Sequence, residues 1–135
     1  MTILFDTNVL LDVLLGRTHA EEGLFLLDRA RDGSVDGAVT PTVLTNTFYV
    51  GRSTAGAKVA RDFVESALSF LDVASVSHAG AMRAVRRYGD FEDGVIGEAG
   101  AEHGTDVICT RNVGDFGPAR PEVLTPMELA GLLRT

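Results

Sequence analysis

The 135-residue chain has little of several features that mark specialised classes of protein. Its single cysteine, Cys109, cannot form a disulfide within the chain. No apolar stretch approaches the roughly 20 residues that a membrane-spanning helix requires. The N-terminal run carries Asp6 and Asp12 where a secretory signal would carry basic residues and a cleavage site. We therefore expect a cytoplasmic protein that does not engage a membrane, with Cys109 as a small buried residue.

The sequence also lacks internal repeats, linkers and low-complexity segments. Hydrophobic residues make up 45% and charged residues 23%, which is typical of globular proteins. A chain of this length can build one substantial core but is too short to divide comfortably into two. We therefore expect one domain, residues 1–135.

Basic residues are in the minority. Twelve Lys and Arg against 19 Asp and Glu give a formal net charge of −7, which argues against a polyanionic partner. That objection weakens if several acids share a metal ion, because the net charge then does not describe the surface around the site.

Short apolar runs alternate with helical patterns along the chain. We expect strands within residues 2–5, 35–40, 72–76 and 105–110, and a strand remnant near 123–124. Helical spacing of apolar residues covers 8–16, 20–33, 55–71, 77–89, 90–104 and the tail after 125, and residues 111–122 read as a loop. This alternation predicts an α/β fold with a mainly parallel sheet that helices cover on both faces.

Residues 42–52 could form a helix or a strand, because most are β-branched or aromatic. We favour a helix, since Val43, Asn46, Thr47 and Val50 would share one face and Pro41 suits a first helical turn.

Three separate segments place carboxylates where a parallel sheet of this kind binds its ligands, beyond the carboxyl ends of the strands. Asp6 directly follows the first strand, and Asp115 lies in the loop after the strand within 105–110. Asp90 and Asp93 share one face at the start of a predicted helix, where the helix dipole favours negative charge. These four acids are therefore expected to meet at one edge of the sheet.

Clustered carboxylates repel one another unless a cation joins them, and Mg²⁺ and Mn²⁺ prefer oxygen ligands. Such an ion can activate water and stabilise charge on a phosphoryl group. Asn8, Thr110 and Asn112 are candidates to hydrogen-bond the ligand carboxylates. The acids thus indicate metal-assisted hydrolysis.

Ordinary structural roles compete with this interpretation. Asp6 and Asp90 could be helix N-caps, and Asp115 could hold a turn. Six further titratable residues are expected to be solvated at the surface, with Glu98 possible at the border of the site: Asp12, Glu92, Glu98, His19, His78 and His103. The joint occurrence of the four acids at predicted strand ends favours the metal site.

Four stretches together resemble the PIN domain family, the metal-dependent nucleases that include the VapC-like ribonuclease toxins. They are FDTNVLLDVLLGR at the start, TPTVLTNTFYV in the middle, and DFEDGVIGEAGAEHG and ICTRNVGDF near the end. Their order and spacing agree with the family nearly end to end. The resemblance implies a compact three-layer α/β/α sandwich with a central, mainly parallel sheet.

The resemblance also implies site residues and partners. The family's catalytic, metal-binding acids fall on Asp6, Asp93 and Asp115, and Asp90 matches an additional metal-binding acid. Asn46 stands where many members have a glutamate, and Asn112 where they often have an acid, so the number of ions and the catalytic strength are open. The implied function is a Mg²⁺- or Mn²⁺-dependent endoribonuclease that forms homodimers and has a possible antitoxin protein as its partner.

An RNA or DNA substrate also needs positive charge near the acids. Arg83, Arg86 and Arg87 precede Asp90, and Arg111 follows Thr110. These four arginines are candidates to contact phosphates without selecting a sequence. An ordinary solvated helix face is the competing interpretation of the first three.

Two alternatives have other chemistry. The first is a catalytically weak or inactive binding or scaffold protein of the same fold, which the neutral Asn46 and Asn112 favour. The second is a phosphatase of the haloacid-dehalogenase type with Asp6 as nucleophile. That family expects a second aspartate two residues later, where this chain has Asn8.

Overall fold

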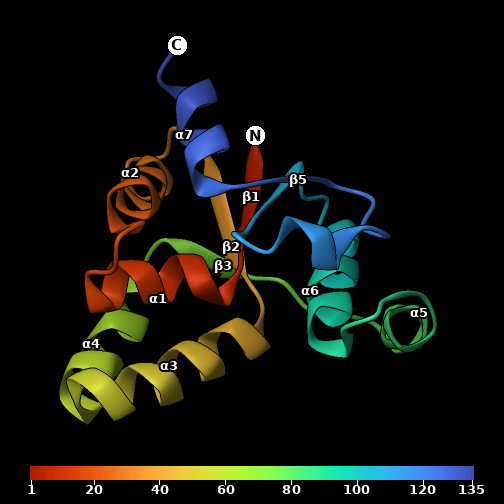
Figure 1. Cartoon of the computed structure of the whole chain (residues 1–135), viewed down its shortest axis with the longest axis horizontal. Coiled ribbons are helices and arrows are strands. Elements are labelled where there is room, and N and C mark those ends of the chain that lie inside the picture. Colours follow the sequence, from red (N-terminus) through yellow and green to blue (C-terminus); the bar gives the residue numbers. More distant parts are fainter.

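The computed structural model of the chain describes residues 1–135. Five strands form one sheet in the order β3-β2-β1-β4-β5, and every neighbouring pair is parallel. The strands are β1 (Thr2–Phe5), β2 (Asp36–Val39), β3 (Leu71–Val73), β4 (Val107–Cys109) and β5 (Glu122–Leu124). The strands all point the same way, so their carboxyl ends share one edge, at the bottom of the sheet in Figure 1.

Seven α-helices surround the sheet. They are α1 (Thr7–Leu15), α2 (Ala20–Arg31), α3 (Pro41–Ala55), α4 (Ala57–Leu68), α5 (His78–Arg87), α6 (Phe91–Glu102) and α7 (Pro126–Leu133). In Figure 1, α5 and α6 lie on one side of the sheet, and α1, α2, α4 and α7 lie on the other. The predicted α/β/α sandwich is confirmed. None of these helices combines the length and apolar character needed to cross a membrane.

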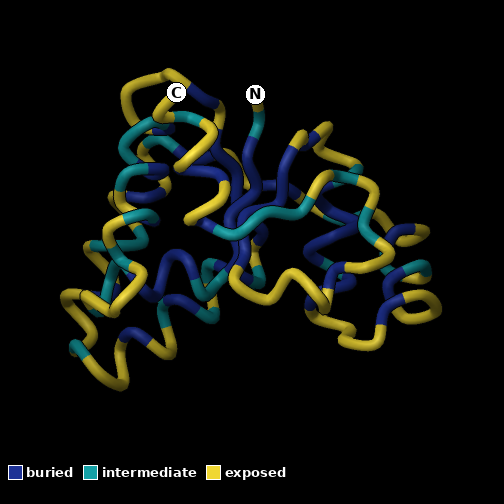
Figure 2. Tube along the Cα trace, turned by 45° about the horizontal axis from the view of Figure 1, so that its top comes forward, coloured by how far each residue is buried: buried dark blue, intermediate teal, exposed yellow.

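The central strand β1 anchors the core. It pairs with β2 on one side and β4 on the other, and Ile3, Leu4 and Phe5 are fully buried. A strand covered on both faces requires a continuous apolar run, which is why its sequence does not alternate. Figure 2 shows the buried central strands surrounded by more exposed helices. Cys109 on β4 is buried, as expected.

The ambiguous middle segment is helical. Thr40 caps α3, since its Oγ1 accepts a hydrogen bond from the Val43 N–H, and Pro41 occupies the first turn. The predicted apolar face is only partly right: Val43 and Thr47 are fully buried, whereas Val50 is 43% exposed. The buried stripe continues at Gly51 instead, where the absent side chain leaves room for Leu14 of α1.

The loop predicted at 111–122 contains a short 3₁₀ helix, η1 (Val113–Phe116), in which Phe116 is buried and Asp115 is exposed. Burial of the Phe116 ring fixes this segment against the core.

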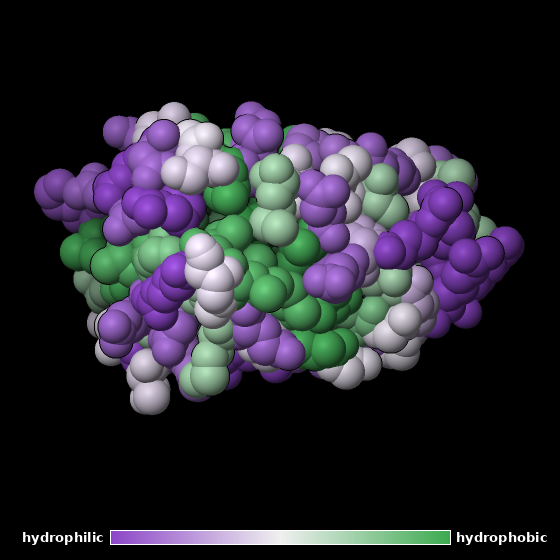
Figure 3. Space-filling view, turned by 90° about the horizontal axis from the view of Figure 1, so that it is seen from above, coloured by the Kyte–Doolittle hydropathy of each residue, from purple (hydrophilic) through white to green (hydrophobic).

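Figure 3 views the molecule from the end at which the parallel strands begin. Apolar side chains gather in the middle of this view, between hydrophilic groups. The acidic positions singled out in the sequence belong to the other end.

Helices α5 and α6 pack closely because α6 is rich in glycine. A Cβ atom on Gly94 would lie 2.9 Å from both Cβ and Cγ of Tyr88, and 3.0 Å from the Cβ of Ala84. These atoms are close to the backbone and cannot swing aside. The position of the α6 N-terminus relative to α5 thus depends on the missing side chain.

We expect Gly94→Ala to lower the free energy of unfolding by about 1–3 kcal/mol through overpacking. Gly131→Ala is the matched control, because Gly131 is also helical and a Cβ there meets nothing within 4 Å. The control should leave stability unchanged or raise it by up to about 1 kcal/mol, since alanine favours helix. Urea denaturation measures both, and equal stability of Gly94→Ala and the wild type would refute the packing argument.

Candidate functional site

Asp6 lies at the end of β1 and is 3% exposed. Its Oδ1 accepts a hydrogen bond of 2.7 Å from the Thr7 N–H, which caps α1. Its Oδ2 accepts hydrogen bonds from Thr110 Oγ1 (2.7 Å) and Asn8 Nδ2 (3.2 Å). Asp6 is therefore a helix cap and also the meeting point of the loops after β1 and β4.

Asp90 and Asp93 occupy the start of α6. Asp90 is exposed and caps the helix, with its Oδ1 2.9 Å from the Asp93 N–H. Asp93 is only 8% exposed, yet neither of its carboxylate oxygens has a hydrogen-bond partner in the structure. Burial without a hydrogen-bond donor disfavours a charged carboxylate, so either a proton or a cation would stabilise this group.

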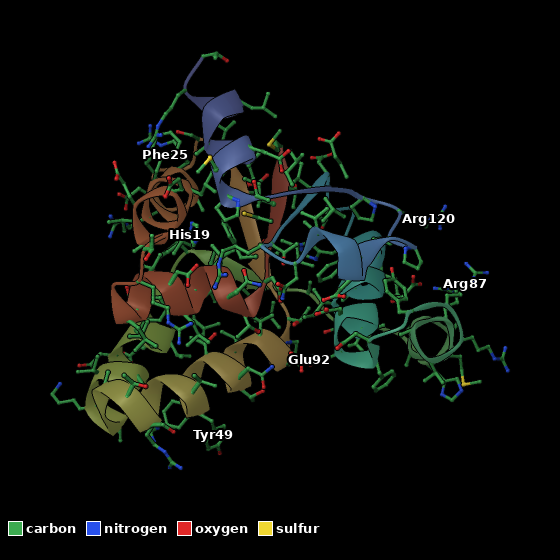
Figure 4. The ribbon with its side chains drawn as sticks, in the orientation of Figure 1. His19, Phe25, Tyr49, Arg87, Glu92 and Arg120 are labelled. Atoms are coloured by element: carbon green, nitrogen blue, oxygen red, sulfur yellow. The ribbon has the colours of Figure 1, made fainter.

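Glu92 is exposed, as expected, but it also lies close enough to this group of acids to interact with Asp6 and Asp90. Its Oε1 accepts a hydrogen bond of 2.7 Å from Asn46 Nδ2 on α3. Figure 4 shows Glu92 between the start of α3 and α6. The sequence signal was weak, because only a donor on a distant element distinguishes Glu92 from an ordinary first-turn acid.

The acids act on one another electrostatically. Burial, and then the charges of Asp6, Asp90, Asp115 and Glu92, raise the pKa of Asp93 to about 7. Burial also raises the pKa of Asp6, although its three hydrogen bonds oppose this. Burial and the neighbouring Asp6 and Asp90 raise the pKa of Glu92. The structure thus brings Asp6, Asp90, Asp93 and Asp115 to one edge of the sheet, as predicted, and adds Glu92.

No cationic side chain compensates these five carboxylates. All ion pairs within 4.0 Å involve other acids. No group of three or more His, Cys, Asp or Glu side chains is arranged so that it could hold a metal ion by itself. The chemistry of the donors nevertheless suits a hydrated Mg²⁺ or Mn²⁺ ion, because these hard cations prefer oxygen ligands and Mg²⁺ usually keeps several waters, through which carboxylates further from the ion can act.

The supporting polar residues differ in how they contact this site. Asn8 and Thr110 hold Asp6 and also hydrogen-bond each other at 3.3 Å. The side chain of Asn112 makes no hydrogen bond; only its backbone N–H donates, to Thr110 Oγ1. Asn112 therefore stabilises the loop after β4 through its backbone: its N–H donates to Thr110 Oγ1, and its carbonyl oxygen accepts from the Asp115 N–H.

Two of the four candidate phosphate-binding arginines are engaged elsewhere. Arg111 forms a two-pronged ion pair with Asp12, through Nε (2.8 Å) and Nη2 (3.2 Å). Arg83 Nε donates to Glu98 at 2.6 Å and its guanidinium also lies near Glu102. Asp12 and Glu98 are buried, so the expectation that they are solvated is wrong. Each is a structural acid that its arginine neutralises.

The remaining candidates are free of ion pairs. Arg86 and Arg87 are exposed near the end of α5, and Figure 4 shows Arg87 directed away from Glu92. The three histidines, His19, His78 and His103, are exposed, as expected.

We expect Arg111→Ala to lower the free energy of unfolding by about 3 kcal/mol, because it leaves the buried Asp12 carboxylate largely unpaired. Adding Asp12→Asn should recover part of the loss. Arg87→Ala, the control, should change stability by less than about 0.5 kcal/mol. Chemical denaturation distinguishes these outcomes, and an Arg111→Ala protein as stable as the control would show that the pair is not structural.

The raised pKa of Asp93 predicts a dependence of stability on pH. In chelator-treated protein, ionising Asp93 favours the unfolded chain, so its contribution to stability is lost as the pH rises from about 4 to about 7. Asp93→Asn should remove this loss, and its stability relative to the wild type should be greater at pH 8 than at pH 4. Denaturation curves at both pH values test this, and a constant difference would contradict the raised pKa.

Comparisons with known proteins agree with this fold. A PIN domain family model matches residues 2–114. No curated protein matches the sequence. A toxin–antitoxin complex from Klebsiella pneumoniae contains a chain with 25% identity and a TM-score of 0.67, covering 92% of this chain and 97% of that one.

Two further solved structures share the fold at lower identity. VapBC2 from Rickettsia felis, bound to a promoter DNA fragment, gives a TM-score of 0.69 at 14% identity, covering 93% of this chain and 98% of that chain. The sarcin–ricin loop cleaving toxin VapC20 from Mycobacterium tuberculosis gives 0.66 at 16% identity, covering 87% and 95%. Since the family model spans most of the sequence and the architecture agrees, this chain belongs to the PIN domain family.

Proposed function

We propose that the chain is a divalent-metal-dependent phosphodiesterase, specifically an endoribonuclease of the toxin–antitoxin type. The observation that carries this proposal is the group of uncompensated carboxylates at the carboxyl edge of the sheet, in which the buried Asp93 has no hydrogen-bond partner. Carboxylate oxygens in this arrangement suit Mg²⁺ or Mn²⁺.

Each residue of the proposed site has a defined part. Asp6, Asp93 and Asp115 hold the ion, and Asp90 assists from the α6 cap. Thr110 and Asn8 fix the Asp6 carboxylate by donating hydrogen bonds to Oδ2. When bound, the ion supplies an activated water and stabilises charge on the phosphoryl group. No side-chain nucleophile is needed.

RNA as the substrate is supported by the similar fold of VapC20, a toxin that cleaves the sarcin–ricin loop. In this chain the exposed Arg86 and Arg87 are the remaining candidates for phosphate contacts, since Arg83 and Arg111 serve buried acids. DNA remains a second possible substrate, because phosphate contacts do not separate the two.

A protein partner is supported by the toxin–antitoxin complexes among the similar structures. The chain also exposes apolar surface along α3 and α4, where Phe48 and Tyr49 line a groove and Tyr49 is 57% exposed. We propose an antitoxin as this partner. We also propose a homodimer, which membership of the PIN domain family implies.

A catalytically weak binding or scaffold protein is the second candidate. Neutral Asn46 and Asn112 favour it, as does the absence of a group of three metal-ligating side chains arranged to hold an ion by itself. This alternative would be supported if the protein bound the phosphate backbone of a nucleic acid but did not hydrolyse it in the presence of any of several divalent metal ions.

We expect wild-type protein to bind Mn²⁺ in a calorimetric titration and to cleave mixed short RNAs only when Mn²⁺ or Mg²⁺ is present. Asp6→Asn and Asp93→Asn should each abolish binding and cleavage, because each removes a ligand charge. Glu122→Gln is the control, since Glu122 is exposed at the amino end of β5. Wild-type protein that binds no Mn²⁺, even with oligonucleotide present, would leave the acids as caps and turn residues.

A further inference from the structure

One hydrogen bond links α3 to α6 beside the proposed metal site. Asn46 Nδ2 donates to Glu92 Oε1 at 2.7 Å, although the residues are 46 positions apart in the sequence. Asn46 is half-buried on α3, and Glu92 is in the first turn of α6. The second oxygen of Glu92, Oε2, has no hydrogen-bond partner, so it is free to bind another group.

The link holds Glu92 where its charge is unfavourable. An exposed acid in a first helical turn can extend into water and still interact well with the helix dipole. Glu92 instead stays where Asp6 and Asp90 repel it. Its partner is an amide, which orients a carboxylate but does not neutralise it, in contrast to the arginines that pair with Asp12 and Glu98.

The chain therefore treats two kinds of acid differently. The buried acids Asp12 and Glu98 are paired with arginine, whereas Glu92 is oriented by an amide and lies near other carboxylates. An arrangement of this kind is unfavourable in the isolated protein and becomes favourable when a cation neutralises the group. Glu92 is not needed to cap α6, because Asp90 already caps this helix. The hydrogen bond to Asn46 therefore indicates another role for Glu92.

We propose that Glu92 is a further carboxylate of the divalent-cation site and that Asn46 is the positioning residue that holds it there. This inference rests on the proposed function, because it requires that the site bind an ion. It also gives the neutral residue on α3 a role: Asn46 contributes through the acid that it holds.

The test is calorimetric titration of Mn²⁺ into full-length wild type, Glu92→Gln, Asn46→Ala and the double variant. We expect Glu92→Gln to weaken Mn²⁺ affinity at least about tenfold, and Asn46→Ala to weaken it by about tenfold, the lower end for residues that orient ligands. The double variant should bind no more weakly than Glu92→Gln, since Asn46 has no effect once its acid is removed. Glu122→Gln is the matched control and should bind like the wild type.

Both substitutions lie at the surface of helices, and circular dichroism melting confirms folding before titration. If wild type binds Mn²⁺ and Asp6→Asn abolishes binding, but Glu92→Gln binds like the control, the inference fails while the proposed function stands. If the two single effects add in the double variant, Asn46 does not act through Glu92. If wild type itself binds no Mn²⁺, the proposed function and this inference both fail.

Discussion

The hydrogen bonds to the Asp6 carboxylate hold together the edge of the sheet on which the proposed site depends. Thr110 and Asn8 donate to one oxygen, and the Thr7 N–H donates to the other. These bonds oppose the effect of burial on the pKa of Asp6 and join the ends of β1 and β4. Because β1 is the central strand, buried on both faces, its end is fixed by the core and gives the other acids a fixed reference point.

The distribution of positive charge explains why this edge stays acidic. Arg111 and Arg83 neutralise Asp12 and Glu98, the buried acids that stabilise the fold. No arginine or lysine lies within 4.0 Å of the five acids at the carboxyl edge. Arginine side chains therefore neutralise the two buried structural acids. The repulsion among the acids at the carboxyl edge is left without a compensating side chain, and there we propose that an ion binds.

A capping role does not conflict with the metal-binding role that we propose for the same side chains. Asp6 and Asp90 both cap helices, so the structural interpretation of each is correct as far as it goes. Each cap uses only one carboxylate oxygen: Oδ2 of Asp90 has no hydrogen-bond partner, and Oδ2 of Asp6 accepts hydrogen bonds from Thr110 and Asn8. The starts of α1 and α6 therefore fix the positions of Asp6 and Asp90 through their capping hydrogen bonds. Asp93 lies in the first turn of α6, and Asp115 lies in the η1 segment.

The sequence by itself determined the alternation of strands and helices, the parallel sheet, the end of the first helix at Gly16, the start of α3 near Pro41, and the meeting of Asp6, Asp90, Asp93 and Asp115 at one edge. These features follow from local rules: apolar periodicity, capping residues, and the common direction of parallel strands. Tertiary structure alone decided the pairing of Asp12 with Arg111, of Glu98 with Arg83, and of Glu92 with Asn46. Each pair joins residues on different elements, so its formation depends on how the helices pack, which local sequence patterns do not encode.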